Sequence, residues 1–107
     1  MNELKDKVAL VTGGSTGIGQ ATAIAFAQAG AKVAIASRTP AAGEKTVSQI
    51  KAAGGDAVFI KTDVTQASEV EALVDKTVSI YGRLDCAFNN AGIEGKLGAI
   101  ADETEDN

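Results

Sequence analysis

The sequence predicts an α/β fold in which helices cover both faces of a parallel sheet. Short apolar segments alternate with longer ones whose apolar residues recur every three or four positions, the pattern of repeated strand–helix–strand units. The short segments are apolar throughout instead of alternating with polar residues, as expected for strands buried on both faces. Glycines follow the helical segments. Together these observations predict a three-layer α/β/α arrangement.

Four strands are expected at residues 8–12, 32–37, 57–62 and 84–88, and three helices at 18–29, 40–53 and 70–81. The buried face of the first helix is predicted to contain Ile18, Ala21, Thr22, Ala25, Phe26 and Ala29. The buried face of the third is predicted to contain Val70, Leu73, Val74, Thr77, Val78 and Tyr81.

The helix ends carry typical signals. Gly30, Gly54 and Gly82 stand where a glycine commonly ends a helix. At the start of the second helix, Thr39 offers a hydroxyl N-cap, and Pro40 takes the first helical position, where its missing N–H costs nothing.

Right-handed crossovers give the four strands the order 3-2-1-4, the first part of a doubly wound Rossmann sheet. Residues 89–102 are expected to form a loop, and Thr104 to cap a fourth helix. Because the sequence ends there and leaves strand four as an apolar edge, we interpret residues 1–107 as the N-terminal half of one Rossmann domain, truncated at the start of the fourth helix. The expected core includes Val11, Val33, Ile35, Ile60 and Leu84.

Composition excludes several classes of function. Ten basic and fourteen acidic residues give a net charge of −4, and no basic cluster is present, which argues against a nucleic-acid or anionic-membrane partner. The single cysteine, Cys86, cannot form an internal disulfide and is expected to be a small buried apolar residue. No long apolar run or signal-like N-terminus is present, so a cytoplasmic location is the expectation. The sequence has no histidine and no metal-ligand cluster.

One glycine-rich segment predicts a specific kind of binding. Between the first strand and the first helix stands Thr12-Gly13-Gly14-Ser15-Thr16-Gly17-Ile18-Gly19. Unpaired N–H groups at a helix N-terminus bind a diphosphate, helped by the helix dipole. Gly13 would permit the tight turn, Gly17 would let the backbone approach the phosphates, and Gly19 would let the helix pack close to the strand. The spacing differs from both G-x-G-x-x-G and the P-loop.

Three motifs together resemble those of the short-chain dehydrogenase/reductase family. The glycine segment is similar to the family's Thr-Gly-x-x-x-Gly-x-Gly, Asp63-Val64 follows strand three, and Asn89-Asn90-Ala91-Gly92 ends strand four. The resemblance covers the whole chain. It implies an oxidoreductase that transfers hydride between a nicotinamide dinucleotide and a small alcohol or ketone, and a full-length protein that forms homo-oligomers.

The resemblance also assigns roles to single residues. Asp63 would accept a hydrogen bond from the adenine amino group, and Val64 would lie against the ring. Asn89 would tie strand four to the Thr12 region. Asp63 as a turn cap near Thr65, and Asn90 as a simple turn residue, are the alternatives. The predicted cofactor-binding residues are Gly13, Ser15, Thr16, Gly17, Ile18, Gly19, Ser37, Arg38, Asp63, Val64, Asn90, Ala91 and Gly92.

The end of strand two favours NADP over NAD. NAD-binding Rossmann proteins hold the ribose hydroxyls with an acid at this position, and an acid would repel a 2′-phosphate. Here Ser37 takes that place and Arg38 follows, a hydroxyl beside a guanidinium that suits a phosphate. Glu44, the nearest carboxylate downstream, lies about a turn into the next helix. The alternative is that Arg38 is only a solvated loop charge.

Catalytic residues are not expected in this segment. The resemblance implies a Tyr-x-x-x-Lys pair and a serine. The one tyrosine, Tyr81, has Asp85 four residues later and falls on an apolar helix face. We therefore expect residues 1–107 to be inactive alone. The alternatives are a non-catalytic dinucleotide-binding or regulatory module, and an α/β structural protein with a fortuitous loop.

Overall fold

The structure is a computed structural model that describes residues 3–13 and 17–89. Four strands form one sheet in the order β3-β2-β1-β4, and every neighbouring pair is parallel. They are β1 (Val8–Thr12), β2 (Lys32–Ser37), β3 (Asp56–Lys61) and β4 (Cys86–Asn89). The predicted fold class and strand order are confirmed. The predicted loop after residue 89 and the fourth helix at Thr104 lie outside the described residues.

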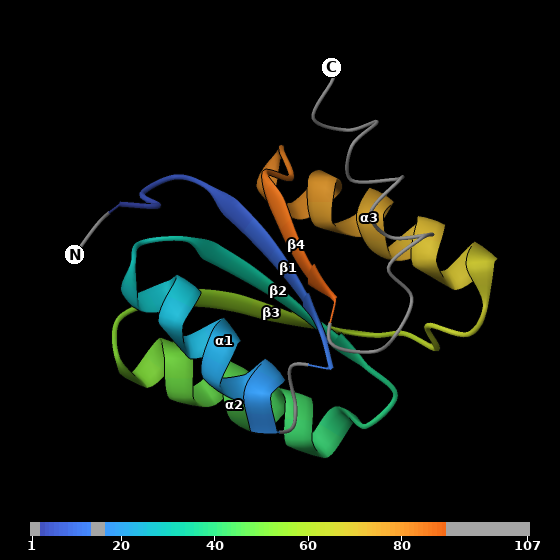
Figure 1. The fold of residues 1–107 in the computed structure, drawn as a ribbon, viewed down its shortest axis with the longest axis horizontal. Helices are drawn as coiled ribbons and strands as arrows, with labels where there is room; N and C mark the ends of the chain where they lie inside the picture. The colour runs from blue at the N-terminus through green and yellow to red at the C-terminus, as the bar shows by residue number, and fades with distance from the viewer. Residues whose placement is uncertain (1–2, 14–16, 90–107) are drawn as a thin grey trace.

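Three helices complete the layers: α1 (Gly17–Gln28), α2 (Pro40–Ala52) and α3 (Ala67–Tyr81). Figure 1 shows α1 and α2 on one face of the sheet and α3 on the other. Each face has its own core. The α1/α2-side core consists of Val11, Ala23, Val33, Ile35, Ile50 and Ala57. The α3-side core consists of Val8, Leu10, Ala34, Ala36, Ile60, Val70, Leu73, Val74 and Leu84. All five predicted core residues are buried.

The predicted buried face of α1 is wrong for most of its residues, although Phe26 does pack against the α1/α2-side core, whereas the predicted face of α3 is confirmed. In α1 the buried residues are Gly19 and Ala23, and Ile18 is 69% exposed. Ala21 and Ala25, which were predicted to be buried, are exposed. Almost every residue of this helix is small or apolar, so a spacing of three and four fits more than one face. In α3, polar residues separate the apolar ones, and one face alone fits.

Smaller corrections concern the ends of elements. Thr39 makes no capping hydrogen bond with its side chain; instead its N–H donates to Ser37 Oγ at 3.3 Å. β3 lies one residue earlier than predicted, and β4 begins at Cys86, although Leu84 is still buried. Cys86 is half-buried and not the fully buried residue expected.

One glycine sets how closely α2 packs on the sheet. Gly43 is buried in the first turn of α2, and a Cβ atom there would collide with two ring carbons of Phe59 on β3. A side chain at position 43 would therefore force the helix or the ring to move. This close contact fixes the start of α2 over β3. That start lies just after the carboxyl end of β2.

Asp85 joins the start of β1 to the segment before β4. Its Oδ2 accepts a hydrogen bond from the Val8 N–H at 2.8 Å, and its own N–H donates to the Val8 oxygen at 2.9 Å. Its Oδ1 accepts two hydrogen bonds from the Arg83 guanidinium, at 3.0 and 2.7 Å. Burial alone would raise the pKa of the Asp85 carboxyl, but the hydrogen bonds from Arg83 and Val8 outweigh it and lower the pKa below its usual value.

We expect Asp85→Asn to lower the free energy of unfolding by about 1–2 kcal/mol at neutral pH, since a charged acceptor is lost from the part-buried hydrogen bond that the Val8 N–H donates. A carboxyl whose folded pKa is lowered stabilises the fold above its unfolded pKa of about 4, and this is lost as the pH falls through the folded pKa. Urea unfolding of both proteins from pH 7 to pH 3 should therefore show the difference shrinking in acid. A difference that does not change with pH would contradict this account. Arg83→Ala should cost less, because the Arg83 side chain is 51% exposed.

Candidate functional site

Those predicted site residues that the structure describes lie at the carboxyl edge of the sheet. The strand register pairs Thr12 with Ala36 and with Asn89, and Ser37 with Lys61, so the strands end side by side. Figure 1 shows their arrowheads together near the start of α1. In a parallel sheet with helices on both faces, ligands bind at this edge, where the strand order reverses on either side of β1.

The described glycines at the two ends of the glycine segment adopt backbone conformations that favour glycine. Gly13 and Gly17 have positive φ values of 71° and 42°, which other residues rarely adopt. The Gly13 N–H donates to the Ala36 oxygen at 2.9 Å, which fixes the turn to β2. A Cβ at Gly17 would meet no atom within 4 Å, so its backbone is open to a ligand, whereas Gly19 is buried. Ser15 and Thr16 lie outside the described residues.

The start of α1 suits a negatively charged group. Its first N–H groups have no partner within the helix, and the helix dipole adds a partial positive charge. No acidic side chain stands in its first turn, and Ile18 is largely exposed there. These features fit the diphosphate of a dinucleotide.

β2 ends without a carboxylate. Ser37 is half-buried at the strand end, and Arg38 is exposed directly after it. Arg38 follows β2 and Asp63 follows its neighbouring strand β3, and the positive charge of Arg38 contributes to lowering the pKa of Asp63. Both signs of charge therefore meet here: a guanidinium after β2 and a carboxylate after β3.

Asp63 caps the turn that follows β3, as in the alternative raised from the sequence. Its Oδ1 accepts hydrogen bonds from the Thr65 N–H at 3.0 Å and from the Thr65 hydroxyl at 2.6 Å. These hydrogen bonds, with a smaller contribution from Arg38, lower the pKa of Asp63, so the carboxylate is ionised at neutral pH. Both contacts use Oδ1, and among residues 3–13 and 17–89 no donor to Oδ2 is found. Val64 is half-buried and packs against the α3-side core.

The end of β4 is only partly described. The backbone of Asn89 pairs with that of Thr12 in the β1–β4 ladder, and the predicted tie between strand four and the Thr12 region stays a prediction. The positions of Asn90, Ala91 and Gly92 fall outside the described residues.

Tyr81 lies at the opposite edge of the sheet and is unsuited to proton transfer. Its hydroxyl donates to Asp56 Oδ1 at 3.2 Å, and the Lys32 ammonium lies 5.8 Å from the centroid of its ring. Burial of the ring, together with the charge of Asp56, raises the pKa of Tyr81 above its usual range. A catalytic tyrosine needs the opposite shift.

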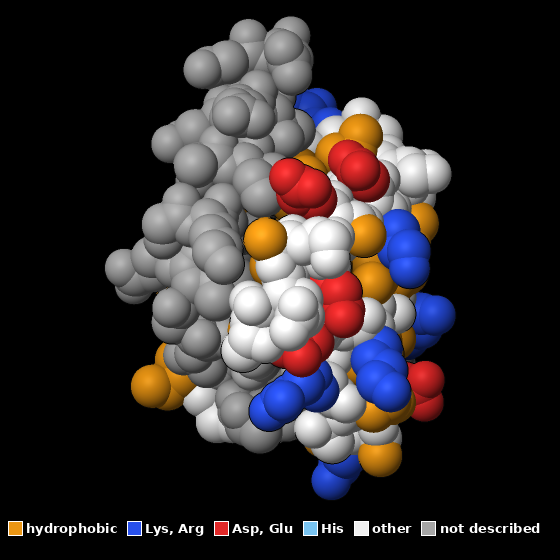
Figure 2. All heavy atoms as spheres, turned by 90° about the vertical axis from the view of Figure 1, so that its right-hand side faces the viewer, with side chains coloured by type: hydrophobic (Ala, Val, Ile, Leu, Met, Phe, Trp, Pro, Cys, Tyr) orange, Lys and Arg blue, Asp and Glu red, His pale blue; other side chains and the backbone are white. Residues whose placement is uncertain are grey.

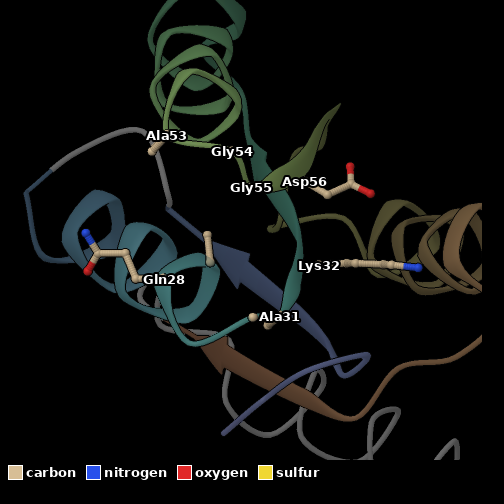
Figure 3. A pocket seen from close by; sticks show the side chains of 9 residues that line it. Gln28, Ala31, Lys32, Ala53, Gly54, Gly55 and Asp56 are labelled. Carbon is tan, nitrogen blue, oxygen red and sulfur yellow. The ribbon is translucent and has the colours of Figure 1, made fainter. Parts of the chain in front are cut away.

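A hollow of about 470 Å³ also lies at that opposite edge, where β2 and β3 begin and α1 and α2 end. Figure 3 shows its wall of small residues, with Gln28, Lys32 and Asp56 extending away from it. It is therefore remote from the glycine segment and separate from the candidate site. Its walls are mostly alanine and glycine, which offer a ligand few specific contacts.

The described part of the surface was compared with the requirements of three other kinds of partner: nucleic acid, metal and membrane. On the face drawn in Figure 2, acidic and basic side chains are interspersed and do not form a basic patch. Within residues 3–13 and 17–89, no three potential metal-ligating side chains come together. None of the three described helices combines the length and the apolar character needed to cross a membrane.

Two residues near the site were not predicted from the sequence. The sequence pattern points to Thr65 only as the neighbour of a possible cap and assigns no role to Glu69. In the structure Glu69 Oε1 accepts a hydrogen bond from the Asp63 N–H at 2.8 Å. The available signal was its position three residues after Gln66, the N-cap of α3, where a glutamate often helps to cap a helix.

Comparisons with known proteins agree with this geometry. The family model described as short chain dehydrogenase matches residues 7–107. An uncharacterised oxidoreductase of Listeria innocua is 48% identical over 90 residues, which are 84% of this chain and 36% of that protein. A short chain dehydrogenase/reductase of Aspergillus oryzae is 41% identical over 96% of this chain and 40% of its own.

A solved structure shows the same fold. The hydroxysteroid dehydrogenase of Escherichia coli superposes with a TM-score of 0.81 at 39% identity, covering 83% of this chain and 38% of that one. The chain thus spans little more than a third of the length of these relatives. Its family match, strand order and glycine turn agree, and the chain belongs to the short-chain dehydrogenase family.

Proposed function

We propose that the protein is an NADP(H)-dependent oxidoreductase that interconverts an alcohol and a carbonyl compound, and that residues 1–107 bind the dinucleotide. The observation that supports the choice of NADP is the end of β2, where Ser37 and the exposed Arg38 stand in place of a carboxylate. The bound dinucleotide supplies or accepts the hydride.

The turn between β1 and α1 binds the diphosphate in this proposal. Gly13 shapes the turn, Gly17 leaves room for the phosphates, and Gly19 keeps the helix close to the sheet. Ser15 and Thr16 contribute polar contacts, and the backbone amide of Ile18 reaches the diphosphate or the neighbouring ribose. The positive end of the α1 dipole offsets part of the ligand's negative charge.

The other strand ends bind the adenosine part. Asp63 accepts a hydrogen bond from the adenine amino group through Oδ2, because Thr65 occupies Oδ1. The exposed part of Val64 lies against the ring. Asn90, Ala91 and Gly92 line the adenosine ribose. Ser37 and Arg38 bind the 2′-phosphate, which the guanidinium can contact with paired, charge-assisted hydrogen bonds.

The substrate is proposed to be a small alcohol or ketone, in keeping with the hydroxysteroid dehydrogenase among the similar structures. We place no catalytic residue within these 107 residues, because Tyr81 has its pKa raised and lies at the wrong edge. A cytoplasmic, homo-oligomeric protein completes the proposal.

The test is equilibrium binding of NADPH and NADH to the protein expressed from its complete gene, followed by nicotinamide fluorescence, with turnover of a panel of secondary alcohols and ketones. NADPH should bind at least about tenfold more tightly, the effect of one charged contact. Equal affinities would refute the choice of NADP. Binding without turnover of any panel member would favour the non-catalytic module.

A further inference from the structure

The turn at Asp63 is held by hydrogen bonds to the backbone N–H, the backbone oxygen and the carboxylate of Asp63. The Asp63 N–H donates to Glu69 Oε1 at 2.8 Å, and the Asp63 oxygen accepts from the Gln66 N–H at 3.0 Å. Thr65 holds the Oδ1 atom by two further hydrogen bonds. Four contacts therefore fix the position of one exposed turn between β3 and α3.

The contact made by Glu69 is unusual for its place in the helix. Glu69 is the third residue after the N-cap of α3, and a glutamate there commonly bonds back to the N–H of the N-cap residue. In this chain that N–H, on Gln66, already donates to Asp63. Glu69 reaches three residues further back, to Asp63 itself. Its side chain thus orders the strand end more than the start of its own helix.

We propose that Glu69 is a positioning residue that orients the Asp63 carboxylate toward the base of the dinucleotide and so sets the preference for adenine over hypoxanthine. This inference rests on the proposed role of Asp63. Adenine presents an amino donor at C6, whereas hypoxanthine presents an oxygen acceptor there. A carboxylate fixed in place attracts the first and repels the second, but one that can turn away discriminates less.

The chain offers variants that separate a positioning role from a general effect of charge. Glu69→Ala removes the hydrogen bond to Asp63. Glu69→Gln removes the charge but keeps an oxygen able to accept the Asp63 N–H. Glu71→Ala removes an acid two residues away, on the same helix, for which the described residues show no hydrogen bond or ion pair. Asp63→Asn tests the recognising group itself.

The experiment measures binding of NADPH and of its reduced hypoxanthine analogue by nicotinamide fluorescence, using the protein expressed from its complete gene. The unmodified protein should prefer adenine by about tenfold or more. Glu69→Ala should reduce this preference to about threefold or less, while Glu69→Gln and Glu71→Ala keep it within about twofold. Amide hydrogen exchange at Asp63, without cofactor, should become faster in Glu69→Ala alone. Thermal unfolding of each variant verifies that the fold is intact.

The failures of the two proposals are distinguishable. If the unmodified protein binds both dinucleotides equally and Asp63→Asn changes nothing, the adenine role of Asp63 is wrong, and the inference falls with it. If Asp63→Asn abolishes the preference while Glu69→Ala retains it, only the positioning role is overturned. A Glu69→Gln variant that behaves like Glu69→Ala would also overturn it, because charge and not the hydrogen bond would then be the cause.

Discussion

Replacing Leu73 by alanine is expected to lower the free energy of unfolding by ~2–5 kcal/mol, the largest stability effect of any single substitution we predict. Leu73 is 1% exposed and lies in the α3-side core. The same core contains strand residues held by pairing on both sides, including Leu10 and Ala36. They cannot move far to fill the space, so the cavity term adds to the lost transfer free energy.

The same helix provides a matched control. Ile80 is an aliphatic residue of similar size that is 51% exposed, so Ile80→Ala should cost less than about 1 kcal/mol. Urea unfolding of both variants, in the protein expressed from its complete gene, measures the difference. The midpoint should shift with an unchanged slope for Leu73→Ala. Equal losses at the two positions would mean that α3 does not pack on the sheet as described.

The sequence was most informative where chemistry constrains an element at both ends. β1 and β2 have the predicted bounds. A glycine turn ends β1, and β2 follows Gly30 and ends at the first residue of the polar pair Ser37-Arg38. α3 follows its predicted face because charged residues interrupt the apolar ones. In α1 small apolar residues surround the whole helix, so spacing alone could not identify the buried face formed by Gly19 and Ala23.

Other differences come from contacts between distant residues. Leu84 was predicted to belong to strand four because it is apolar, and it is indeed buried. The strand begins only at Cys86, because Asp85 uses its backbone and side chain to bond Val8, 77 residues earlier. No local pattern around residue 85 indicates that contact.

In the candidate site, too, local sequence patterns predict some features, whereas others depend on how the chain folds back on itself. Motifs place Gly13, Gly17 and Asp63 at strand ends, which parallel pairing necessarily brings to one edge. The hydrogen bond from the Asp63 N–H to Glu69 depends on how the β3–α3 turn folds back, which the residue types leave open. Likewise, the sequence alone could not decide whether Asp63 caps a turn. The structure shows that it does so through Oδ1, while Oδ2 has no partner among the residues that the structure describes.

Replacing Arg38 by alanine is expected to weaken NADP binding by about ten- to 150-fold, or ~1.5–3 kcal/mol, through loss of one charge-assisted phosphate contact. Ser37→Asp should lower NADP affinity as well, because a carboxylate at the end of β2 repels the 2′-phosphate, and should improve NAD binding through the ribose hydroxyls. Fluorescence titration of both dinucleotides with each variant measures these changes. Lys51→Ala, in the last turn of α2, removes an equal charge away from this strand end and should leave both affinities nearly unchanged.

A comparison of the two dinucleotides separates the phosphate contact from any indirect effect of Arg38. Arg38 also helps to lower the pKa of Asp63, so its removal could act through the adenine side of the site. The hydrogen bonds from Thr65 are the larger cause of that lowered pKa, and they remain in the variant. Asp63 should therefore stay ionised at neutral pH, and NAD affinity should be kept. A loss confined to NADP assigns Arg38 to the 2′-phosphate, whereas equal losses for NADP and NAD, or no loss at all, would contradict that assignment.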